Sequence, residues 1–471
     1  MVFSSIEFLF YFLPVTLIGY YALKRWRRAG NVFLSVMSLG FYAFGAPKFF
    51  PIMMASIVLN WLFGLWVDRV REDRKKAKLA LTLMVVFNLG LLGVFKYLMF
   101  MMNSLNLWLG LRLPVPQITL PIGISFFTFQ AMSYVIDVYR GQGKVQKNLV
   151  NVCLYISFFP QLIAGPIVRY QTVAEEIEGR RENLDDFIEG TVRFMRGLCK
   201  KMLLANNMGL LVDTAFRPDM LNSGNLSVVG AWLAACAYLM QVYYDFSGYS
   251  DMAIGLGRMF GFHFLENFTY PFICKSVSEF WSRWHISLGS WFRDYLYIPL
   301  GGSRVSKPRL VFNMLVVWTL TGLWHGAAWT YFLWGLGFGL FLVVERMTGM
   351  GKWMGRHPVG HLYALFVVVT ITVMIRSDNV KAAGIFYASM FGLNGAPLFN
   401  GLTRAFLREY GLFLAAGVLF SLPVPEFLRD RLHVSPNLMK VVGGAALLAL
   451  TFIAITYVAV GSYNPFIYFN F

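Results

Sequence analysis

His325 is the residue of this 471-residue chain best placed to do chemistry, since histidine is the side chain that exchanges a proton near neutral pH. It lies in Leu323-Trp-His-Gly326, with apolar sequence of membrane length on both sides. An ionisable group there costs about a few kcal/mol and marks a functional candidate. A neutral imidazole satisfied by Thr321, one helical turn earlier, is the structural alternative.

His285 is the second candidate among the six histidines. If its segment is helical, one face carries an aromatic and apolar stripe at i, i+3, i+4, i+7 and i+11, and its members are Trp281, Trp284, His285, Leu288 and Phe292. Glu279 and Arg283 would then pair on another face. Such a stripe usually packs in a core, but a histidine within it is less usual.

A buried imidazole stays neutral because desolvation penalises its charged form. It can therefore remove a proton from an acceptor hydroxyl that attacks an activated acyl group. The chain has no GxSxG, HExxH or P-loop motif, and its Gly-x-Gly pairs follow no strand. The spacings Gly257-xxx-Gly261 and Gly335-xxx-Gly339 predict close helix packing instead.

Two polar patches interrupt the apolar sequence. Asp245 and Asp251 end an apolar segment, where they either cap a helix at the membrane interface or line a polar funnel. Asp294, with Arg293 and Arg304 nearby, either belongs to a basic cytoplasmic loop or helps to hold phosphates. The residues alone leave both choices open.

The composition predicts the elements that must position these residues. The chain is 57% hydrophobic and only 14% charged, with a mean hydropathy of +0.58, which excludes a soluble or a disordered protein. We predict an all-α polytopic membrane protein with roughly ten to twelve membrane helices, organised as one domain over residues 1–471. The first apolar run, Phe8 to Leu23, has no basic leader or cleavage site and predicts a retained helix.

The net charge of +17 does not require a nucleic-acid partner. Basic loops fix membrane topology and contact anionic lipid, and they can also contact an anionic soluble cosubstrate. The four cysteines are widely separated and show no CxxC pair, so neither a metal site nor a disulfide framework is expected.

Loops rich in Lys and Arg usually lie in the cytoplasm. The positions of these loops predict that the N-terminus faces outward and that the segment around Arg180 is cytoplasmic. Only one apolar stretch, Leu149 to Val168, lies between the preceding cytoplasmic loop and that segment, and a full crossing would place the segment outside, against the positive-inside rule. It is broken by Phe158-Phe-Pro-Gln161 and Ala164-Gly-Pro166. Because irregular backbone at membrane depth is tolerated only within protein or beside a water-filled cavity, we predict a re-entrant segment next to a cavity.

Six stretches make the chain resemble the membrane-bound O-acyltransferase (MBOAT) family, and within it the bacterial alginate O-acetyltransferase branch. They occur in family order, and they are Leu120-Pro-Ile-Gly-Ile-Ser-Phe-Phe-Thr-Phe-Gln130, Phe159-Pro-Gln-Leu-Ile-Ala-Gly-Pro-Ile-Val-Arg169, Tyr244-Asp-Phe-Ser-Gly-Tyr-Ser-Asp251, Phe280-Trp-Ser-Arg-Trp-His-Ile-Ser287, Arg293-Asp-Tyr-Leu-Tyr-Ile-Pro-Leu-Gly-Gly302 and Leu323-Trp-His-Gly326.

The resemblance implies the MBOAT fold, in which membrane helices and re-entrant segments surround a catalytic tunnel. It implies that His325 is the catalytic base and His285 the second family position. Acetyl-CoA would be the cytoplasmic donor, with no permanently bound cofactor. We expect donor contacts and tunnel-lining residues in two groups: Arg283, Trp284, Arg293, Asp294 and Arg304 for the donor, and Trp281, Trp324, Gln161, Asp245 and Asp251 for the tunnel.

The branch implies a multi-pass protein of the bacterial inner membrane that works with a periplasmic acetyltransferase to O-acetylate an exported, alginate-like polysaccharide. One alternative is D-alanyl transfer to teichoic acid, against which stands the stretch Ser133-Tyr-Val-Ile-Asp-Val-Tyr-Arg140. Another is a non-catalytic transporter or flippase, which broken segments and buried polar residues would also suit.

Overall fold

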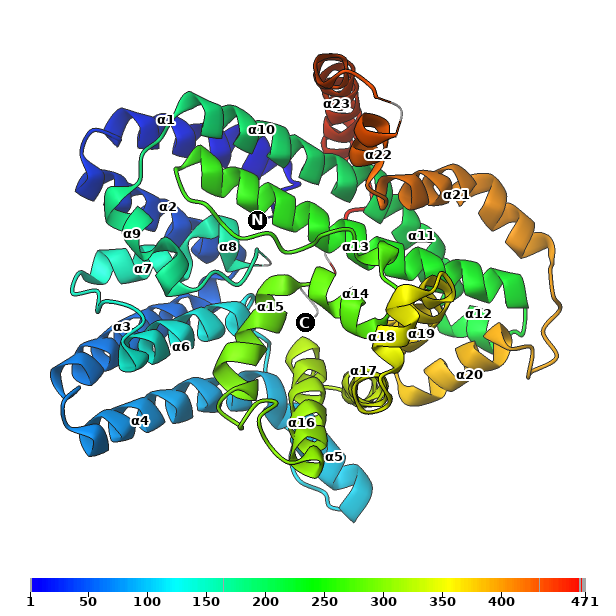
Figure 1. Cartoon of the computed structure of the whole chain (residues 1–471), viewed down its shortest axis with the longest axis horizontal. Helices are drawn as coiled ribbons and strands as arrows, with labels where there is room; N and C mark the ends of the chain where they lie inside the picture. Colours follow the sequence, from blue (N-terminus) through cyan, green and yellow to red (C-terminus); the bar gives the residue numbers. More distant parts are fainter. Residues whose placement is uncertain (1, 164, 432, 466, 468–471) are drawn as a thin grey trace. The chain divides into compact units, whose positions relative to one another are not determined.

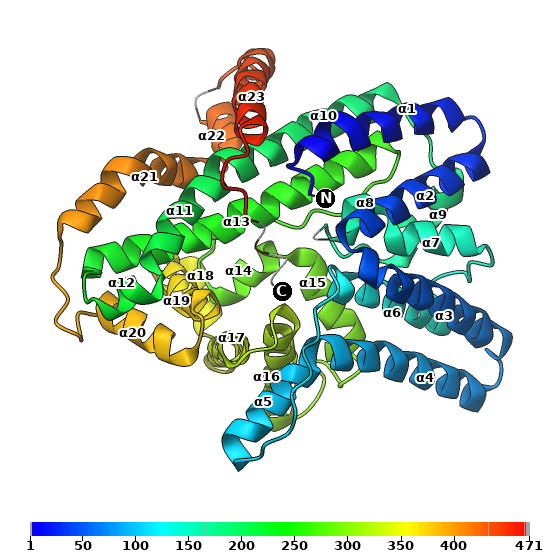
Figure 2. The same ribbon diagram turned by 180° about the vertical axis from the view of Figure 1, so that it is seen from behind.

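The computed structural model is all-helical and describes residues 2–163, 165–431, 433–465 and 467 (Figure 1, Figure 2). Within these residues the extended pairing is a single antiparallel bridge, Phe268 with Trp284. The chain forms two compact units. Unit 1 comprises residues 1–194 and 250–265, and unit 2 comprises residues 195–249 and 266–471. The expectation of one domain over the whole chain stays a prediction.

Unit 1 contains the N-terminal helices and the end of one long helix of unit 2. Short 3₁₀ or π turns are labelled η. Its elements are η1 (Glu7–Phe12), α1 (Leu13–Leu23), α2 (Arg27–Gly45), η2 (Pro47–Phe49), α3 (Phe50–Arg69), α4 (Arg74–Leu92), η3 (Gly93–Tyr97), α5 (Leu98–Leu109), α6 (Ile124–Arg140), α7 (Leu149–Ser157), α8 (Phe159–Leu162), α9 (Tyr170–Gly179) and most of α10 (Leu184–Cys199).

Close packing and polar pairs join α3 to α4 and α6, which lie side by side in both ribbon views (Figure 1, Figure 2). Asn60 and Asn88 exchange two side-chain hydrogen bonds of 3.2 and 2.8 Å between α3 and α4. Gly64 lies against the ring of Tyr134 on α6, where a Cβ would approach to 2.7 Å. Small and amide side chains of this kind allow membrane helices to approach closely.

The predicted break in the stretch Leu149 to Val168 is present. Helix α7 ends at Ser157, Phe158 is extended with ψ 113°, and α8 is a single turn. Most described residues of this stretch are buried, as irregular backbone at membrane depth requires. A small cavity beside it is lined by Leu154, Tyr155, Phe158, Gln161, Val173, Ile177, Phe262 and Phe264. The sidedness of the segment stays a prediction.

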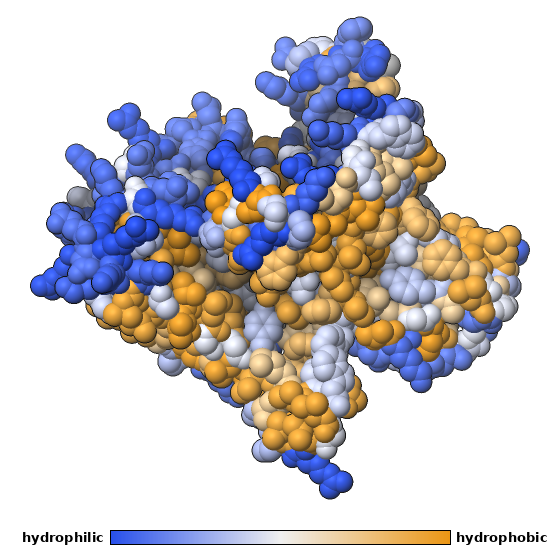
Figure 3. All heavy atoms as spheres, turned by 60° about the horizontal axis from the view of Figure 1, so that its bottom comes forward, coloured by the Kyte–Doolittle hydropathy of each residue, from blue (hydrophilic) through white to orange (hydrophobic). Residues whose placement is uncertain are grey.

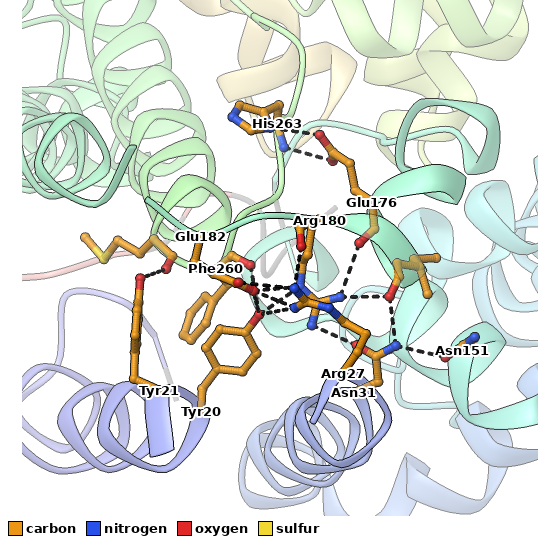
Figure 4. A network of polar contacts seen from close by, with 12 residues as sticks. Tyr20, Tyr21, Arg27, Asn31, Asn151, Glu176, Arg180, Glu182, Phe260 and His263 are labelled. Carbon is orange, nitrogen blue, oxygen red and sulfur yellow. Dashed lines mark hydrogen bonds and ion pairs between the residues drawn. The ribbon is translucent and has the colours of Figure 1, made fainter. Parts of the chain in front are cut away.

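A polar network around Arg180 joins α1, α2 and the segment that follows α9 in unit 1 (Figure 4). The guanidinium donates to the Tyr20 hydroxyl at 2.8 Å and to the Asn31 amide oxygen at 2.7 Å. Glu182 pairs with Arg27 at 2.5 Å and also accepts from Tyr20. Arg180 is 4% exposed, so this cation is buried among polar groups of the protein, and the cytoplasmic side of its segment stays a prediction.

Unit 2 carries both candidate histidines. Its elements are η4 (Lys200–Ala205), α11 (Asn206–Ala215), α12 (Pro218–Asn222), α13 (Val228–Met259), whose last turns belong to unit 1, η5 (Pro271–Ile273), α14 (Val277–Arg283), α15 (Ile286–Phe292), η6 (Arg293–Tyr297), α16 (Lys307–His325), α17 (Trp329–Thr348), α18 (Met350–Arg356), α19 (Val359–Arg376), α20 (Val380–Met390), α21 (Gly401–Phe420), α22 (Val424–Asp430) and α23 (Pro436–Ala459).

Helices α16 and α17 form the closest helix pair of unit 2. A Cβ on Gly335 would lie 2.4 Å from the Trp318 carbonyl oxygen, and one on Gly339 would lie 3.0 Å from the Trp318 Cβ. The predicted packing role of Gly335-xxx-Gly339 is confirmed. That of Gly257-xxx-Gly261 is wrong, because α13 ends at Met259 and Gly261 follows it with φ 78°.

Long apolar helices make this a multi-pass membrane protein. Among the described residues, five helices have the length and composition of a membrane span: Pro47–Arg69, Arg74–Leu109, Trp329–Thr348, Val359–Arg376 and Pro436–Ala459. The bent pair of α21 and α22 would make a sixth. Apolar side chains stay exposed on these helices, and wide apolar areas cover the face in Figure 3. The number that meets this test is below the ten to twelve expected, because several apolar stretches form shorter or broken helices.

His263 links α9 to α10 just beyond the end of α13. Its ring contacts the Glu176 carboxylate at 2.8 Å (Figure 4). It also contacts the Asp186 carboxylate at 3.3 Å, and Arg258 lies 3.9 Å from Asp186. Burial lowers the pKa of His263, but the hydrogen bonds to Glu176 and Asp186 outweigh it, so the pKa is raised above 6.5. The stabilisation that protonated His263 contributes is therefore complete when the pH is below the pKa of this group in the unfolded protein. It is lost as the pH rises through the pKa of the group in the folded protein.

We predict that His263→Gln lowers the melting temperature more at about pH 6 than at about pH 9, because only the protonated imidazole gains from both carboxylates. Thermal unfolding in detergent at both pH values measures this. His357→Gln is the matched control, because that ring is exposed and contacts the Trp353 carbonyl. An equal loss at both pH values would contradict the prediction.

Candidate active site

His325 is the last residue of α16 and is 6% exposed. The α16–α17 packing brings aromatic rings around it, with centroids 5.0 Å away for Trp324 and 5.2 Å for Trp334. Thr321, the partner considered from the sequence, donates its hydroxyl to the Val317 carbonyl at 2.8 Å. The imidazole therefore lies in a largely apolar enclosure, which favours its neutral form.

His285 occupies a sharp turn rather than the middle of a helix. Helix α14 ends at Arg283, Trp284 is extended, and His285 has φ 47° and ψ 50° before α15 begins. The continuous helical stripe expected around His285 is thus wrong. The reason is a pairing with residues 267–269, in which Thr269 N donates to Arg283 O and Ile286 N to Asn267 O, both at 3.0 Å. The expected Glu279–Arg283 pair is present at 3.0 Å.

The fold brings the two histidines together although 40 positions separate 285 from 325 in the sequence. Their ring centroids are 6.0 Å apart. His285 is 1% exposed, and the ring of Phe246 on α13 meets it edge to face at 4.5 Å. Two neighbouring imidazoles in a low-dielectric enclosure can take and return a proton, as acyl transfer to a hydroxyl requires.

Of the residues expected from the sequence to line the tunnel, two lie near the histidines in unit 2 and two belong to unit 1. Trp324 lies beside both imidazoles, with ring centroids 6.1 Å from His285 and 5.0 Å from His325. Trp281 lies 5.7 Å from Trp334, which packs on His325. Gln161 and Asp251 belong to unit 1. Gln161 lines its small cavity, and Asp251 pairs with Arg193 at 3.0 Å.

Asp245 forms a buried ion pair with Lys201. The carboxylate and ammonium lie 2.7 Å apart, and their side chains are 2% and 3% exposed. Asp245 also accepts from Ile467 N at 3.1 Å, and Lys201 donates to the Pro465 carbonyl. The carboxylate therefore binds both the Lys201 ammonium and the backbone N–H of Ile467, and it lies within α13 rather than at a helix end.

The residues expected to contact the donor lie outside the histidine enclosure, except for Trp284. Arg293 and Asp294 pair with each other at 2.7 Å on η6, and Arg304 is exposed in the following turn. Arg283 is held by Glu279 and donates to the Thr269 carbonyl at 3.2 Å. Trp284 is buried and stacks on Phe280. A role for these residues in donor binding stays a prediction.

Asn267, Lys201 and Lys96 are among the polar residues that the structure buries and that sequence reasoning missed. Asn267 contacts His285, Lys201 pairs with Asp245, and Lys96 of η3 donates to the Ser125 hydroxyl at 3.1 Å. The sequence could have marked Lys96 as a candidate, because this charged residue directly follows the apolar run Leu79 to Phe95. The described residues contain no cluster of three or more metal-ligating side chains, and the four cysteines are free.

Comparisons with known proteins identify the relatives of this sequence. The sequence model of the membrane-bound O-acyltransferase family, MBOAT, matches residues 144–374, which include both histidines. A probable alginate O-acetylase from Pseudomonas putida is 40% identical, and the alignment covers 100% of each chain. A peptidoglycan O-acetyltransferase from Helicobacter pylori is 30% identical over 100% of this chain and 98% of its own. A teichoic acid D-alanyltransferase from Bacillus subtilis is 29% identical, over 50% of this chain and 62% of its own.

We predict that Lys201→Met destabilises the protein by about 3–5 kcal/mol, because it leaves the Asp245 carboxylate buried without its cation. The double variant Lys201→Met with Asp245→Leu removes both charges and should recover most of that loss. Thermal or denaturant unfolding in detergent measures both. A double variant less stable than Lys201→Met would show that the pair is not the source of the loss.

Proposed function

Since the chain belongs to the membrane-bound O-acyltransferase family, we propose that it takes the acetyl group of cytoplasmic acetyl-CoA and passes it across the bacterial inner membrane to O-acetylate an exported polysaccharide. The observation that carries this proposal is the pair of buried imidazoles, His285 and His325, with ring centroids 6.0 Å apart inside an aromatic enclosure. Acyl transfer to a hydroxyl needs a base of this kind, shielded from water.

In the proposed step, His325 accepts the proton of the acceptor hydroxyl as its oxygen attacks the thioester carbonyl carbon. The new C–O bond forms, the C–S bond breaks, and the imidazolium returns its proton to the departing thiolate, which leaves as the CoA thiol. His285, whose ring centroid is 6.0 Å from that of His325, orients the acceptor. The aromatic walls exclude water, which would otherwise hydrolyse the thioester.

For the donor, exposed cationic groups of unit 2 support contact with the phosphates of CoA. Arg304 and Arg293 are the candidates in the turns that precede α16, although the guanidinium of Arg293 is already paired with Asp294. We propose that phosphate contacts compete with that pair, while Arg283 and Trp284 hold the turn at His285.

An alginate-like polymer as the final acceptor is supported by the full-length relatives, which are probable alginate O-acetylases and a peptidoglycan O-acetyltransferase. D-alanyl transfer is less well supported, because the teichoic acid D-alanyltransferase covers only half of this chain. We further propose a periplasmic acetyltransferase as the partner that delivers the acetyl group to the sugar.

We predict that His325→Ala leaves membrane abundance intact and reduces polymer acetylation by about 10²- to 10⁴-fold, which is the usual contribution of a general base. Mass spectrometry of the exported polysaccharide, normalised to the amount of protein in the membrane, measures this. His357→Ala is the matched control, since that histidine is exposed. The same variants in vesicles supplied with acetyl-CoA report release of the CoA thiol.

Full acetylation with His325→Ala would contradict the proposed base. Wild-type protein that acylates only from a carrier-protein thioester would favour the D-alanyl alternative. Solute uptake that persists in His325→Ala would favour a transporter.

We predict that Arg181→Cys reacts with an impermeant thiol reagent only from the cytoplasmic face. Arg181 is exposed next to Arg180, and the re-entrant segment returns the chain to that side. Arg112→Cys is the matched control, because it is exposed in the loop between two apolar segments and should react only from the periplasmic face. Labelling of inside-out and right-side-out vesicles measures both. Reaction of Arg181→Cys from the periplasmic face would refute the re-entrant topology.

A further inference from the structure

We propose that Asn267 is a positioning residue that fixes the tautomer of His285, so that this histidine carries its proton on Nδ1 and presents Nε2 as a hydrogen-bond acceptor. The catalytic consequence rests on the proposed acyl transfer. The assignment of the tautomer itself rests on the geometry around Asn267 alone.

Backbone pairing holds Asn267 beside His285. Asn267 is 1% exposed, and its backbone carbonyl accepts from Ile286 N, the residue directly after His285, at 3.0 Å. The bridge between Phe268 and Trp284 continues the contact. The relative placement of the amide and the imidazole is therefore set by the main chain.

A backbone donor determines which way the Asn267 amide faces. Its Oδ1 accepts from the backbone N of Ser287 at 3.1 Å and from the Ser287 hydroxyl at 2.9 Å. A backbone N–H can only donate, so the amide atom that faces it must be the oxygen. The opposite orientation of the amide would set two N–H groups against each other.

The orientation of the amide determines the state of the imidazole. Nδ1 of His285 lies 3.3 Å from the same Oδ1. An amide oxygen only accepts, so Nδ1 must carry the proton, and in a neutral imidazole the other nitrogen is then an acceptor. His285 is buried, which favours the neutral ring, and its Nε2 has no hydrogen-bond partner among the residues that the structure describes.

This assignment refines the role of His285. A ring with a bare Nε2 cannot polarise a thioester carbonyl by donating to it from that atom. It can accept a hydrogen bond from the acceptor hydroxyl and so hold that oxygen near His325, whose ring centroid is 6.0 Å away. His285 therefore orients the nucleophile, and Asn267 sets this role through the tautomer.

Magic-angle-spinning NMR of full-length protein with ¹⁵N-labelled histidine in lipid tests the assignment directly. The His285 signals are identified by their loss in His285→Ala. We expect a protonated Nδ1 and a bare Nε2 for wild type, and loss of this signature in Asn267→Ala. Asn267→Asp keeps an acceptor oxygen and should keep a protonated Nδ1.

Transfer rates provide the second readout. Asn267→Ala should lower acetyl-CoA-dependent transfer by about 10- to 100-fold, a part of what a general base contributes. Asn267→Asp should move the acid limb of the pH–rate profile to higher pH, because a carboxylate favours the imidazolium. Asn313→Ala is the matched control. Asn313 is a fully buried asparagine of α16 that donates to the Leu300 and Gly302 carbonyls, and its loss should leave the His285 signature unchanged.

A wild-type spectrum with a protonated Nε2 and a bare Nδ1 would overturn the proposal, whatever the activity of the variants. An unchanged His285 signature in Asn267→Ala would overturn it too. Full acetylation by His325→Ala would instead refute the proposed function and leave the tautomer assignment standing, so the two failures are distinguishable.

Discussion

The antiparallel contact between residues 267–269 and 283–286 is the constraint on which the candidate site depends. It ends α14 at Arg283 and holds His285 at φ 47°. A left-handed conformation costs a residue other than glycine about 1–2 kcal/mol. Two backbone hydrogen bonds, each contributing about 0.5–1.5 kcal/mol, offset that cost. Without this contact, α14 would be free to continue through residue 285. His285 would then lie on the same helical face as Trp281 and not in the turn between α14 and α15.

Residue types and hydropathy singled out His325 and His285, which the structure brings together, but they did not predict how the chain positions them. His325 stands out because an ionisable group within apolar sequence is costly, and this does not depend on tertiary structure. The turn at His285 could not be predicted, because the donor at Ile286 meets an acceptor 19 positions earlier in the sequence. Periodicity describes a segment in isolation, so it assigned a helix where a long-range pairing intervenes.

Sequence patterns do not include contacts between distant residues. For this reason the sequence left two interpretations of Asp245 open and predicted more membrane spans than the described residues contain. The sequence offered a helix cap or a polar funnel for Asp245, but the partner is Lys201, 44 positions away. Apolar stretches predicted where helices form, yet burial within protein relaxes the need for about 20 apolar residues in one helix. The pair α7 and α8 illustrates this, since it breaks at Phe158 while its described residues stay largely buried.

Electrostatics assigns different states to the two histidines during turnover. At a centroid separation of 6.0 Å, two imidazolium ions would repel each other by about 3 kcal/mol at an effective dielectric constant of 20. Burial adds a further penalty for each charge. Only one ring can therefore hold the extra proton at a time. If, as proposed, the Asn267 oxygen receives the Nδ1 proton of His285, that ring contributes to the proposed transfer as a neutral acceptor. His325 is then the group whose charge changes in that proposal.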